Sequence, residues 1–508
     1  MIFRIVKLLV FLLIVFSSCH QSGGNYYMEN ISLQEEGFSQ SGEEYNSIIE
    51  HRFRSPLNQP LSTFSIDVDN AAYANIRRFI FSQQLPPANA VRIEEMINYF
   101  DYNYPQPEGK HPFNIIMETA ECPWNPENQL LQIGLQGKIL HEHETKPNNL
   151  VFLIDVSGSM EMGNKLPLVK KSLNILLENL DENDKVALVV YAGAAGLVLP
   201  STPASNKSEI YSAFNNIEAG GSTAGGEGIN LAYKVAMENF IPNGNNRVIL
   251  ASDGDFNVGI TSEKGLLDLI EEKRESGVYL TICSYGMGNL KDGRMEQISN
   301  AGNGNYFYID DQKEAAKVFS KDFAANMYTI AKDVKIQIEF NPKFVSSYRL
   351  IGYENRQLKN EDFENDKKDA GELGAGHSVT AIYEIVPAKD NESSNMNLKY
   401  QSKVLKKGNG NDELGHIKFQ YKPIDSEESI LMEHKIMNES KPFKSASRDF
   451  KFSCSVAGFG LLLRNSSYKG NLTYADLFEL TKPLIDKDKK IENEFLEMIK
   501  KAETLQNI

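Results

Sequence analysis

The chain has 508 residues, in which 68 Asp and Glu outnumber 53 Lys and Arg, so the formal net charge at pH 7 is −15. Hydrophobic residues make up 41% and charged residues 24%, the balance of an ordinary globular protein rather than a disordered or fibrous one. The acidic charge argues against broad nucleic-acid binding and against charge-driven adhesion to anionic lipid, because both need a basic face. The length predicts roughly three to four domains.

The first residues differ from the rest of the chain. A basic start precedes an apolar run over residues 8–16, which is well short of the roughly 20 residues needed to span a bilayer. Two serines and then Cys19 follow, and small residues before a cysteine at this point resemble a bacterial lipobox. The resemblance implies a lipoprotein signal peptide over residues 1–18, cleavage before Cys19 and lipid attached to Cys19. Phe16 departs from the usual aliphatic residue, and a plain secretory peptide or an uncleaved anchor are the alternatives.

The stretch after the cysteine is polar. Residues 19–59 are rich in Ser, Gly, Glu and Asn and show little periodicity, which predicts a flexible tether. We therefore expect a cell-envelope protein held to a bacterial membrane by lipid, with the outer membrane preferred and the periplasmic or surface face left open. Removing Cys19 leaves three cysteines, an odd number, so at least one is expected to be free or paired between molecules.

Residues 60–147 are expected to form an N-terminal domain of helices and strands. The sequence of residues 60–100 indicates a strand followed by a helix that Asp69 or Asn70 caps. A turn fixed by prolines and a second helix are expected after it. Metal binding by Asp67 and Asp69 is a less favoured alternative to local capping. Trp124 is expected to be a packing anchor rather than a ligand platform.

Residues 148–332 alternate between short apolar runs and stretches with helical spacing. Continuous apolar runs of this length are typical of strands buried on both faces. The runs lie at residues 150–154, 185–191, 247–251, 278–285 and 305–309, and the helices at 166–180, 209–217, 228–240, 264–275, 294–300 and 312–331. This alternation predicts an α/β fold with a doubly wound, mostly parallel sheet, in which ligands bind beyond the carboxyl ends of the strands.

Polar residues follow two of these strands directly. Asp155, Ser157 and Ser159 come after the first strand, Asp253 comes after the third, and Thr223 lies between them just before a helix. Carboxylate and hydroxyl oxygens are hard ligands that suit Mg²⁺, Mn²⁺ or Ca²⁺ rather than zinc. With so few carboxylates, a bound divalent ion would keep net positive charge and an open coordination position.

At these residues the chain resembles the von Willebrand factor type A (VWA) domain, whose metal-ion-dependent adhesion site combines Asp-x-Ser-x-Ser with a distant Thr and a distant Asp. The resemblance implies that Ser157, Ser159 and Thr223 bind the ion directly, while Asp155 and Asp253 hold it largely through water. It also implies that the open position takes an acidic side chain from a partner protein. Mg²⁺ is the expected ion, with Mn²⁺ or Ca²⁺ possible; simple capping by these Asp and Ser residues is the alternative.

The regions before and after residues 148–332 indicate one particular group of VWA proteins. Residues 60–100 and 452–470 resemble the flanking domains of one group of bacterial VWA lipoproteins, the YfbK-like family. Residues 333–424 are expected to be β-rich and to pair with strands at 113–135 in a flanking β-sandwich that carries the VWA domain as an insertion. Residues 425–508 are expected to be mostly helical. The expected strands of the sandwich are Phe113–Met117, Leu130–Leu135, Val334–Phe340, Val379–Ile385, Leu398–Leu405 and His416–Tyr421.

Three function classes remain open. The favoured one is an anchored module that binds an as yet unknown protein through a metal ion and has no enzyme activity, because the chain has no Walker loop, GxSxG or HExxH motif. The alternatives are a structural or envelope-assembly lipoprotein without a working metal site, and a metal-assisted hydrolase in which the ion activates water.

Overall fold

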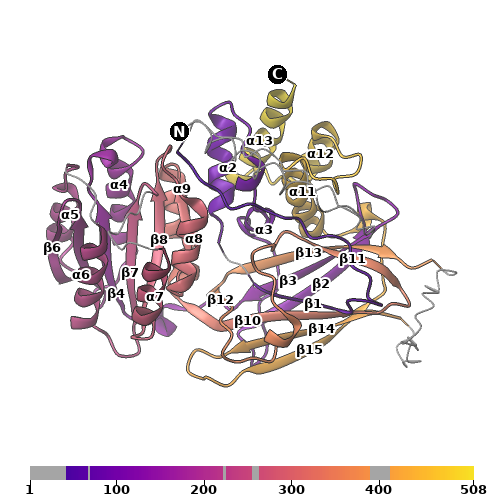
Figure 1. Ribbon diagram of the computed structural model, residues 1–508, viewed down its shortest axis with the longest axis horizontal. Coiled ribbons are helices and arrows are strands. Elements are labelled where there is room, and N and C mark those ends of the chain that lie inside the picture. The colour runs from indigo at the N-terminus through magenta and orange to yellow at the C-terminus, as the bar shows by residue number, and fades with distance from the viewer. Residues whose placement is uncertain (1–41, 67–68, 221–224, 255–262, 390–411, 508) are drawn as a thin grey trace, which may run out of the picture. The chain divides into compact units, whose positions relative to one another are not determined.

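The computed structural model describes residues 42–66, 69–220, 225–254, 263–389 and 412–507 (Figure 1). Cys19, Thr223 and the predicted strand Leu398–Leu405 lie outside the described residues. No helix among the described residues has the length and apolar character needed to cross a membrane.

A six-stranded sheet forms the centre of the VWA region, in the order β6-β5-β4-β7-β8-β9. All neighbouring pairs are parallel except β5 and β6. The strands are β4 (Asn148–Asp155), β5 (Lys185–Tyr191), β6 (Ala195–Pro203), β7 (Asn245–Ser252), β8 (Val278–Tyr285) and β9 (Tyr306–Ile309). The doubly wound, mostly parallel sheet is therefore confirmed. The edge strand β6 was not predicted, because Leu197 and Val198 are exposed and its sequence lacks a buried apolar run.

Alternate residues of β4 face two different layers of helices. Leu150, Phe152 and Ile154 belong to the apolar cluster that contains α4 (Leu166–Leu177) and α5 (Lys207–Asn215). Val151 and Leu153 belong to the cluster on the other face. That cluster contains α6 (Gly225–Glu238), α7 (Glu263–Arg274) and α8 (Asp292–Ala301). Burial on both faces explains why these strands appear in the sequence as continuous apolar runs.

The predicted closing helix over residues 312–331 is shorter and broken. It consists of α9 (Gln312–Ala316), a π-helical turn (Lys317–Lys321) and α10 (Phe323–Met327). The chain then enters β10 at Thr329, where Thr329 pairs with Gly374 of a neighbouring strand. Tertiary pairing therefore overrides the helical spacing at the end of this segment.

Two antiparallel sheets flank the VWA region, in the orders β1-β10-β14-β15, with β12 on β10, and β11-β13-β3-β2. β3 precedes the VWA region and pairs along its length with β13, which follows it, so the VWA domain is an insertion. The rings of Phe64 on β1 and Phe340 on β10 pack edge-on against Tyr383 on β13, which joins the two sheets in one core. The strands are β1 (Leu61–Ser65), β2 (Phe113–Glu121), β3 (Gln129–Gly137), β10 (Thr329–Phe340), β11 (Val345–Ile351), β12 (Gly371–Gly374), β13 (Ser378–Pro387), β14 (Glu413–Lys422) and β15 (Ile430–Met437).

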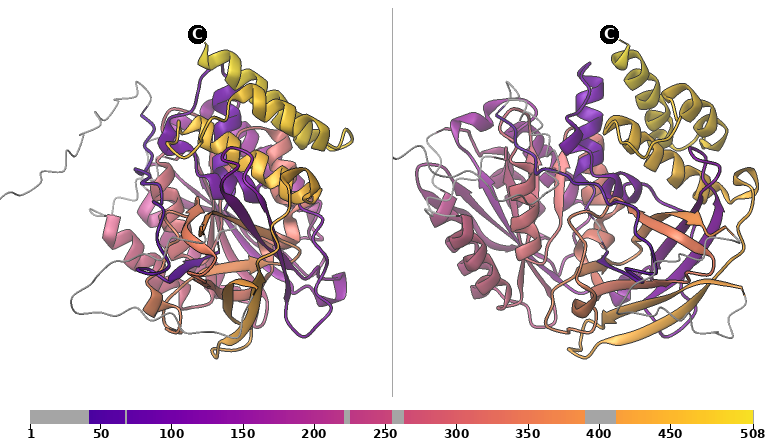
Figure 2. Two further views of the ribbon diagram at one scale, coloured as in Figure 1. Left: turned by 90° about the vertical axis from the view of Figure 1, so that its right-hand side faces the viewer. Right: turned by 45° about the vertical axis from the view of Figure 1, so that its right-hand side comes forward.

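Helices from the two ends of the described chain pack together, as Figure 2 shows for the yellow C-terminal helices beside the indigo α2. Phe100, Phe452 and Phe495 meet edge to face in this core, and Trp124 is buried in the same cluster, as expected of a packing anchor. β15 lies in the segment predicted to be mostly helical, where its side chains alternate in exposure along one edge of a sheet. The helices are α2 (Ala71–Phe81), α3 (Ile93–Asn98), α11 (Arg448–Leu463), α12 (Tyr474–Thr481) and α13 (Lys490–Gln506).

The predicted capping of α2 by Asp69 or Asn70 is confirmed only in position. Asn70 occupies the N-cap position but makes no side-chain cap hydrogen bond. Asp69 instead accepts the backbone N–H of Tyr306 at 2.9 Å and pairs with Arg356 at 3.0 Å. This carboxylate therefore joins the N-terminal domain to β9.

The described part of the predicted tether packs against the folded chain. Glu43 pairs with Arg78 at 3.0 Å and accepts the backbone N–H of Gly288 at 2.9 Å. Further along, Arg54 and Tyr348 exchange two backbone hydrogen bonds of 2.9 Å. Over residues 42–59 the polar composition thus reflects fixed polar contacts, which differs from the flexible tether expected there.

The three cysteines among the described residues, Cys122, Cys283 and Cys454, are all free and buried. Burial raises the pKa of each thiol. This agrees with the expectation that at least one cysteine is free or paired between molecules.

Candidate metal site

Asp155 and Asp253 lie at neighbouring strand ends. Asp155 is the last residue of β4, Asp253 directly follows β7, and the two strands are in register through Ile154 and Ala251. The chain leaves β4 for β5 on one side and reaches β7 on the other side, so the strand order reverses between β4 and β7. Ligands of open α/β sheets bind at such a switch point, beyond the carboxyl ends of the strands.

The Asp155 carboxylate is buried, with about 1% of the residue exposed. Its Oδ1 accepts the backbone N–H of Ser157 at 2.8 Å, and its Oδ2 has a long contact of 3.4 Å from the Tyr191 hydroxyl. Among the described residues no basic side chain lies within ion-pair distance of it. Burial raises the pKa of this carboxyl, and the negative charge of Asp253 adds to the rise. A buried anion with so little compensation is a favourable place for a cation.

The two serines of the motif converge. The Ser157 and Ser159 hydroxyl oxygens are 3.0 Å apart, with Ser157 buried and Ser159 exposed. Ser157 is the last residue before a short 3₁₀ turn over Gly158–Glu161, which brings Ser159 back beside it. The two hydroxyls therefore lie next to the Asp155 carboxylate with one of them open to a ligand.

Asp253 is fixed by two side chains that were not predicted. Its Oδ2 accepts from the Lys165 ammonium at 2.8 Å and from the Asn289 amide at 3.2 Å. Gly254 follows with φ of +96°, and a Cβ there would lie 2.7 Å from the Leu290 Cα. Only glycine can make this turn so close to the neighbouring loop.

Lys165 left a weak signal in the sequence. It occupies the N-cap position of α4, where a positive charge opposes the helix dipole. A lysine in that position is unusual unless a nearby carboxylate holds it. Asn289 is one polar residue in the loop after β8, and nothing in its surroundings in the sequence distinguishes it.

Thr223 lies outside the described residues, but the chain before it reaches the site. Gly220 donates its backbone N–H to the Val156 carbonyl at 2.7 Å, next to Asp155. The structure thus brings together Asp155, Ser157, Ser159 and Asp253 of the five predicted ligands.

The donors suit a hard divalent ion. Two hydroxyls and two carboxylates supply only oxygen, the ligand that Mg²⁺ and Mn²⁺ prefer. The described residues contain no cluster of three or more His, Cys, Asp or Glu side chains placed to hold a metal ion. A metal centre at this edge would therefore depend on the serine hydroxyls as well as on the carboxylates.

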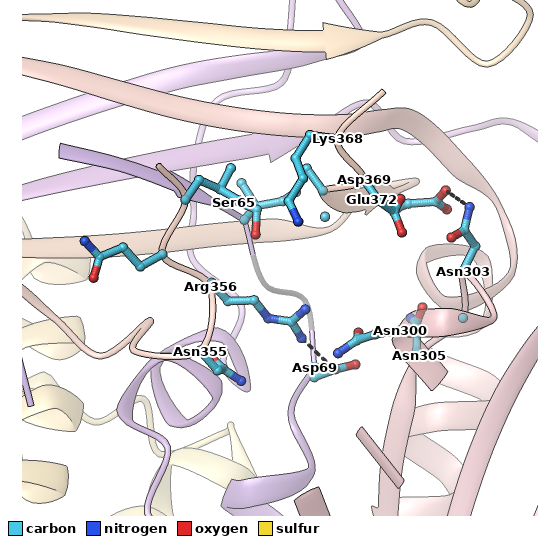
Figure 3. A pocket seen from close by; sticks show the side chains of 16 residues that line it. Ser65, Asp69, Asn300, Asn303, Asn305, Asn355, Arg356, Lys368, Asp369 and Glu372 are labelled. Carbon is cyan, nitrogen blue, oxygen red and sulfur yellow. Dashed lines mark hydrogen bonds and ion pairs between the residues drawn. The ribbon is translucent and has the colours of Figure 1, made fainter. Parts of the chain in front are cut away.

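A second polar feature lies between the VWA domain and the sandwich. A cavity of about 310 Å³ is lined by Asp69, Arg356, Glu372 and several asparagines, and Figure 3 shows the Asp69–Arg356 pair in it. Burial raises the pKa of the Glu372 carboxyl to about 7. The residues lining it include none of the predicted metal ligands, so the cavity is separate from the site at β4 and β7.

Comparisons with known proteins identify the regions of the chain. Residues 149–321 match the von Willebrand factor type A domain, residues 39–132 match a model described as von Willebrand factor, and residues 325–505 match the C-terminal region of the uncharacterized protein YfbK. The uncharacterized protein YfbK of Escherichia coli (strain K12) is 39% identical over 473 residues, which cover 91% of this chain and 82% of that protein.

Two more distant similarities concern smaller parts or the fold alone. Inter-alpha-trypsin inhibitor heavy chain H4 of Homo sapiens is 34% identical over 149 residues, which cover 27% of this chain and 16% of that protein. The solved structure of von Willebrand factor type A from Catenulispora acidiphila is 15% identical, covers 78% of this chain and 92% of that chain, and has a TM-score of 0.44.

Proposed function

The chain belongs to the YfbK family of VWA-domain proteins, and from this membership we propose that it is a lipid-anchored protein of the bacterial cell envelope that binds a partner protein through a divalent metal ion. The ion, Mg²⁺ in the first instance, is held between the ends of β4 and β7 by Asp155, Ser157, Ser159, Thr223 and Asp253. The partner supplies an acidic side chain to the open coordination position.

The observation that carries this proposal is the state of Asp155. Its carboxylate is buried at a strand-order reversal, next to two hydroxyls, and no basic side chain of the described chain compensates it. A buried carboxylate without a cation is costly, and the pKa of this one is raised accordingly. A divalent ion at this point removes the cost and uses the converging hydroxyls.

The chain's own residues have separate tasks at the ion. The Ser157 N–H orients the Asp155 carboxylate, and Lys165 and Asn289 orient Asp253. Ser159 is exposed and so lies on the side from which a partner approaches. The ion supplies the positive charge that attracts the partner's carboxylate, which an acidic protein with a net charge of −15 would otherwise repel.

Capture of the partner tests this function. Immobilised wild-type protein is incubated with solubilised envelope in Mg²⁺ or in chelator, beside Asp155→Asn as the matched variant. We expect the same proteins to be recovered by the wild type in Mg²⁺ and lost both in chelator and with Asp155→Asn. Equal recovery of these proteins in Mg²⁺, in chelator and with Asp155→Asn would contradict metal-mediated binding. That result would favour a structural role in the envelope.

The lipid anchor is tested separately. Cys19→Ala removes the only residue proposed to carry lipid, so the protein is expected to leave the membrane fraction and become soluble. Ser18→Ala keeps a small residue before the cysteine and is expected to remain with membranes. Membrane fractionation of Cys19→Ala at the wild-type level would contradict lipidation.

A further inference from the structure

Lys165 is buried inside the candidate metal site, where the VWA motif does not include it. We propose that Lys165 is a built-in second cation of this site, which weakens binding of the divalent ion and leaves the occupied site with net positive charge, so that its partner group is an anion. This inference rests on the metal site proposed above and deepens it, because it explains the net charge that the occupied site presents to the partner.

The geometry places the ammonium on a ligand carboxylate. Lys165 Nζ lies 2.8 Å from Asp253 Oδ2, and the two side chains are 2% and 1% exposed. Long lysine side chains normally keep their charged end in water. Here the whole side chain is withdrawn from water, and Asp253 is the acid that it meets.

A neighbouring loop is shaped to receive this side chain. Gly286, just after β8, has φ of +80°, and a Cβ there would lie 2.5 Å from both Cγ and Cε of Lys165. The Gly286 carbonyl is held by the Tyr308 hydroxyl. The space for the lysine stem therefore exists only because residue 286 is glycine. The start of α4, the loop after β8 and Tyr308 of β9 together build the buried position of Lys165, which is not a chance surface contact.

The local position of Lys165 works against it. As the N-cap residue of α4 it brings a positive charge to the positive end of the helix dipole. Its side chain accordingly contributes no cap hydrogen bond to the helix. Capping therefore does not explain a lysine at this position, whereas the carboxylate of Asp253 does.

The charge count gives the functional consequence. Among the described residues of the site, Asp155 and Asp253 with Lys165 carry one net negative charge, and a divalent ion turns this into one net positive charge. Without Lys165 the same ion would leave the site neutral. Charges a few ångströms apart interact more strongly in a largely buried site than in water. Lys165 thus repels the metal ion and, once the ion is bound, strengthens attraction for a carboxylate.

Metal titration of the full chain in detergent tests the first half of the proposal. Lys165→Met keeps the stem and removes the charge, Lys165→Arg keeps a charge, and Lys171→Met removes an exposed charge from the same helix. We expect Lys165→Met to bind Mn²⁺ at least about tenfold more tightly than the wild type, while Lys171→Met stays within about twofold. Equal or weaker binding by a folded Lys165→Met overturns the proposal.

A carboxylate probe tests the second half. Acetate that binds to protein-held Mn²⁺ displaces water and lowers the water proton relaxation rate. This fall is expected at lower acetate concentration in the wild type than in Lys165→Met, the opposite order to their metal affinities. If Lys165→Met binds both Mn²⁺ and acetate more tightly than the wild type, the inference is overturned.

A second variant keeps the proposal testable if Lys165→Met does not fold. It also separates the proposed metal site from the proposed role of Lys165. Gly286→Ala displaces the Lys165 stem without touching its charge, so it is expected to tighten Mn²⁺ binding in the same direction as Lys165→Met. If the wild type and all variants, Asp155→Asn included, bind no metal, the proposed function fails. If the wild type binds Mn²⁺ through Asp155 but Lys165→Met and Gly286→Ala bind it no better, only the role of Lys165 fails.

Discussion

The guanidinium of Arg77 on α2 donates to the carboxylate of Glu314 on α9 over 2.8 Å, across 237 positions of the chain. Arg77 also pairs with Asp310 at the end of β9 and, at 3.1 Å, with Glu494 on α13. Its side chain is only 5% exposed. One buried cation therefore ties the N-terminal helix to the VWA domain and to the C-terminal helix.

Replacing Arg77 by Met is expected to destabilise the protein strongly. The change leaves Asp310 and Glu314 buried without their cation, a loss of about 3 to 5 kcal/mol in the free energy of unfolding. Urea denaturation measures it. Lys313→Met is the control, because the Lys313 side chain is 78% exposed and its contact with Glu494 is long, at 4.0 Å. A loss no larger than that of the control would contradict the role given to Arg77.

Asp155→Asn is expected to separate folding from metal binding. Asn keeps an oxygen for the Ser157 N–H and removes a buried charge, so the metal-free protein should be about 1 kcal/mol more stable, or unchanged. The rise in melting temperature that Mg²⁺ gives the wild type should disappear. Thermal melts with and without Mg²⁺ check both points, and a retained Mg²⁺ effect would count against Asp155 as a ligand.

Ser159→Ala is expected to weaken metal binding without changing the fold. The hydroxyl is exposed and its one described contact is with Ser157, so the metal-free melting temperature should stay at the wild-type value. Loss of a ligand should lower Mn²⁺ affinity by about tenfold or more. Calorimetry measures it beside Ser208→Ala, which removes an exposed hydroxyl from α5. Equal affinities in these two variants would exclude Ser159 from the site.

Glu372→Gln is expected to change how stability depends on pH. Burial raises the pKa of Glu372 from its ordinary 4.5 to about 7 in the folded protein, with a hydrogen bond from Thr329 opposing the rise. The stability that protonated Glu372 contributes is therefore fully present below pH 4.5 and is lost as pH rises through about 7. Gln imitates the protonated form at every pH.

The variant should accordingly match the wild type near pH 4.5 and exceed it at pH 8. Because the side chain is half-buried, the expected gap at pH 8 is about 2 kcal/mol rather than the full value of the pKa shift. Urea denaturation at the two pH values measures the gap. A gap that is constant across this range would show that Glu372 titrates normally.

The VWA sheet was predictable because its central strands are buried on both faces. Leu150 to Ile154 form one apolar run whose alternate residues meet different helix layers, and the strand after it has the same character. β6 and β15 escaped prediction for the opposite reason. Both are edge strands with exposed apolar side chains, such as Leu197 and Leu431, so neither contains the continuous buried apolar run that reveals the central strands.

The site was predictable as far as its residues follow strand ends. Asp155 and Asp253 come directly after β4 and β7, and adjacent strand ends bring them together. The partners of Asp253 were harder to predict, because Lys165 left only a weak signal at the start of α4 and Asn289 left none in the loop after β8. Contacts between side chains far apart in sequence depend on loop conformation, which no local pattern encodes. The bonds of Asp69 to Tyr306 and Arg356 escaped prediction for the same reason.

The most direct test of the central claim is a calorimetric titration of Mg²⁺ and Mn²⁺ into the purified full chain, with Asp155→Asn titrated in parallel. The account predicts saturable binding of one ion per chain to the wild type and no binding to the variant, while both have the same circular dichroism spectrum. A folded wild-type protein that gives no heat and no thermal shift with either ion, or a variant that binds as well as the wild type, would contradict a metal site between β4 and β7.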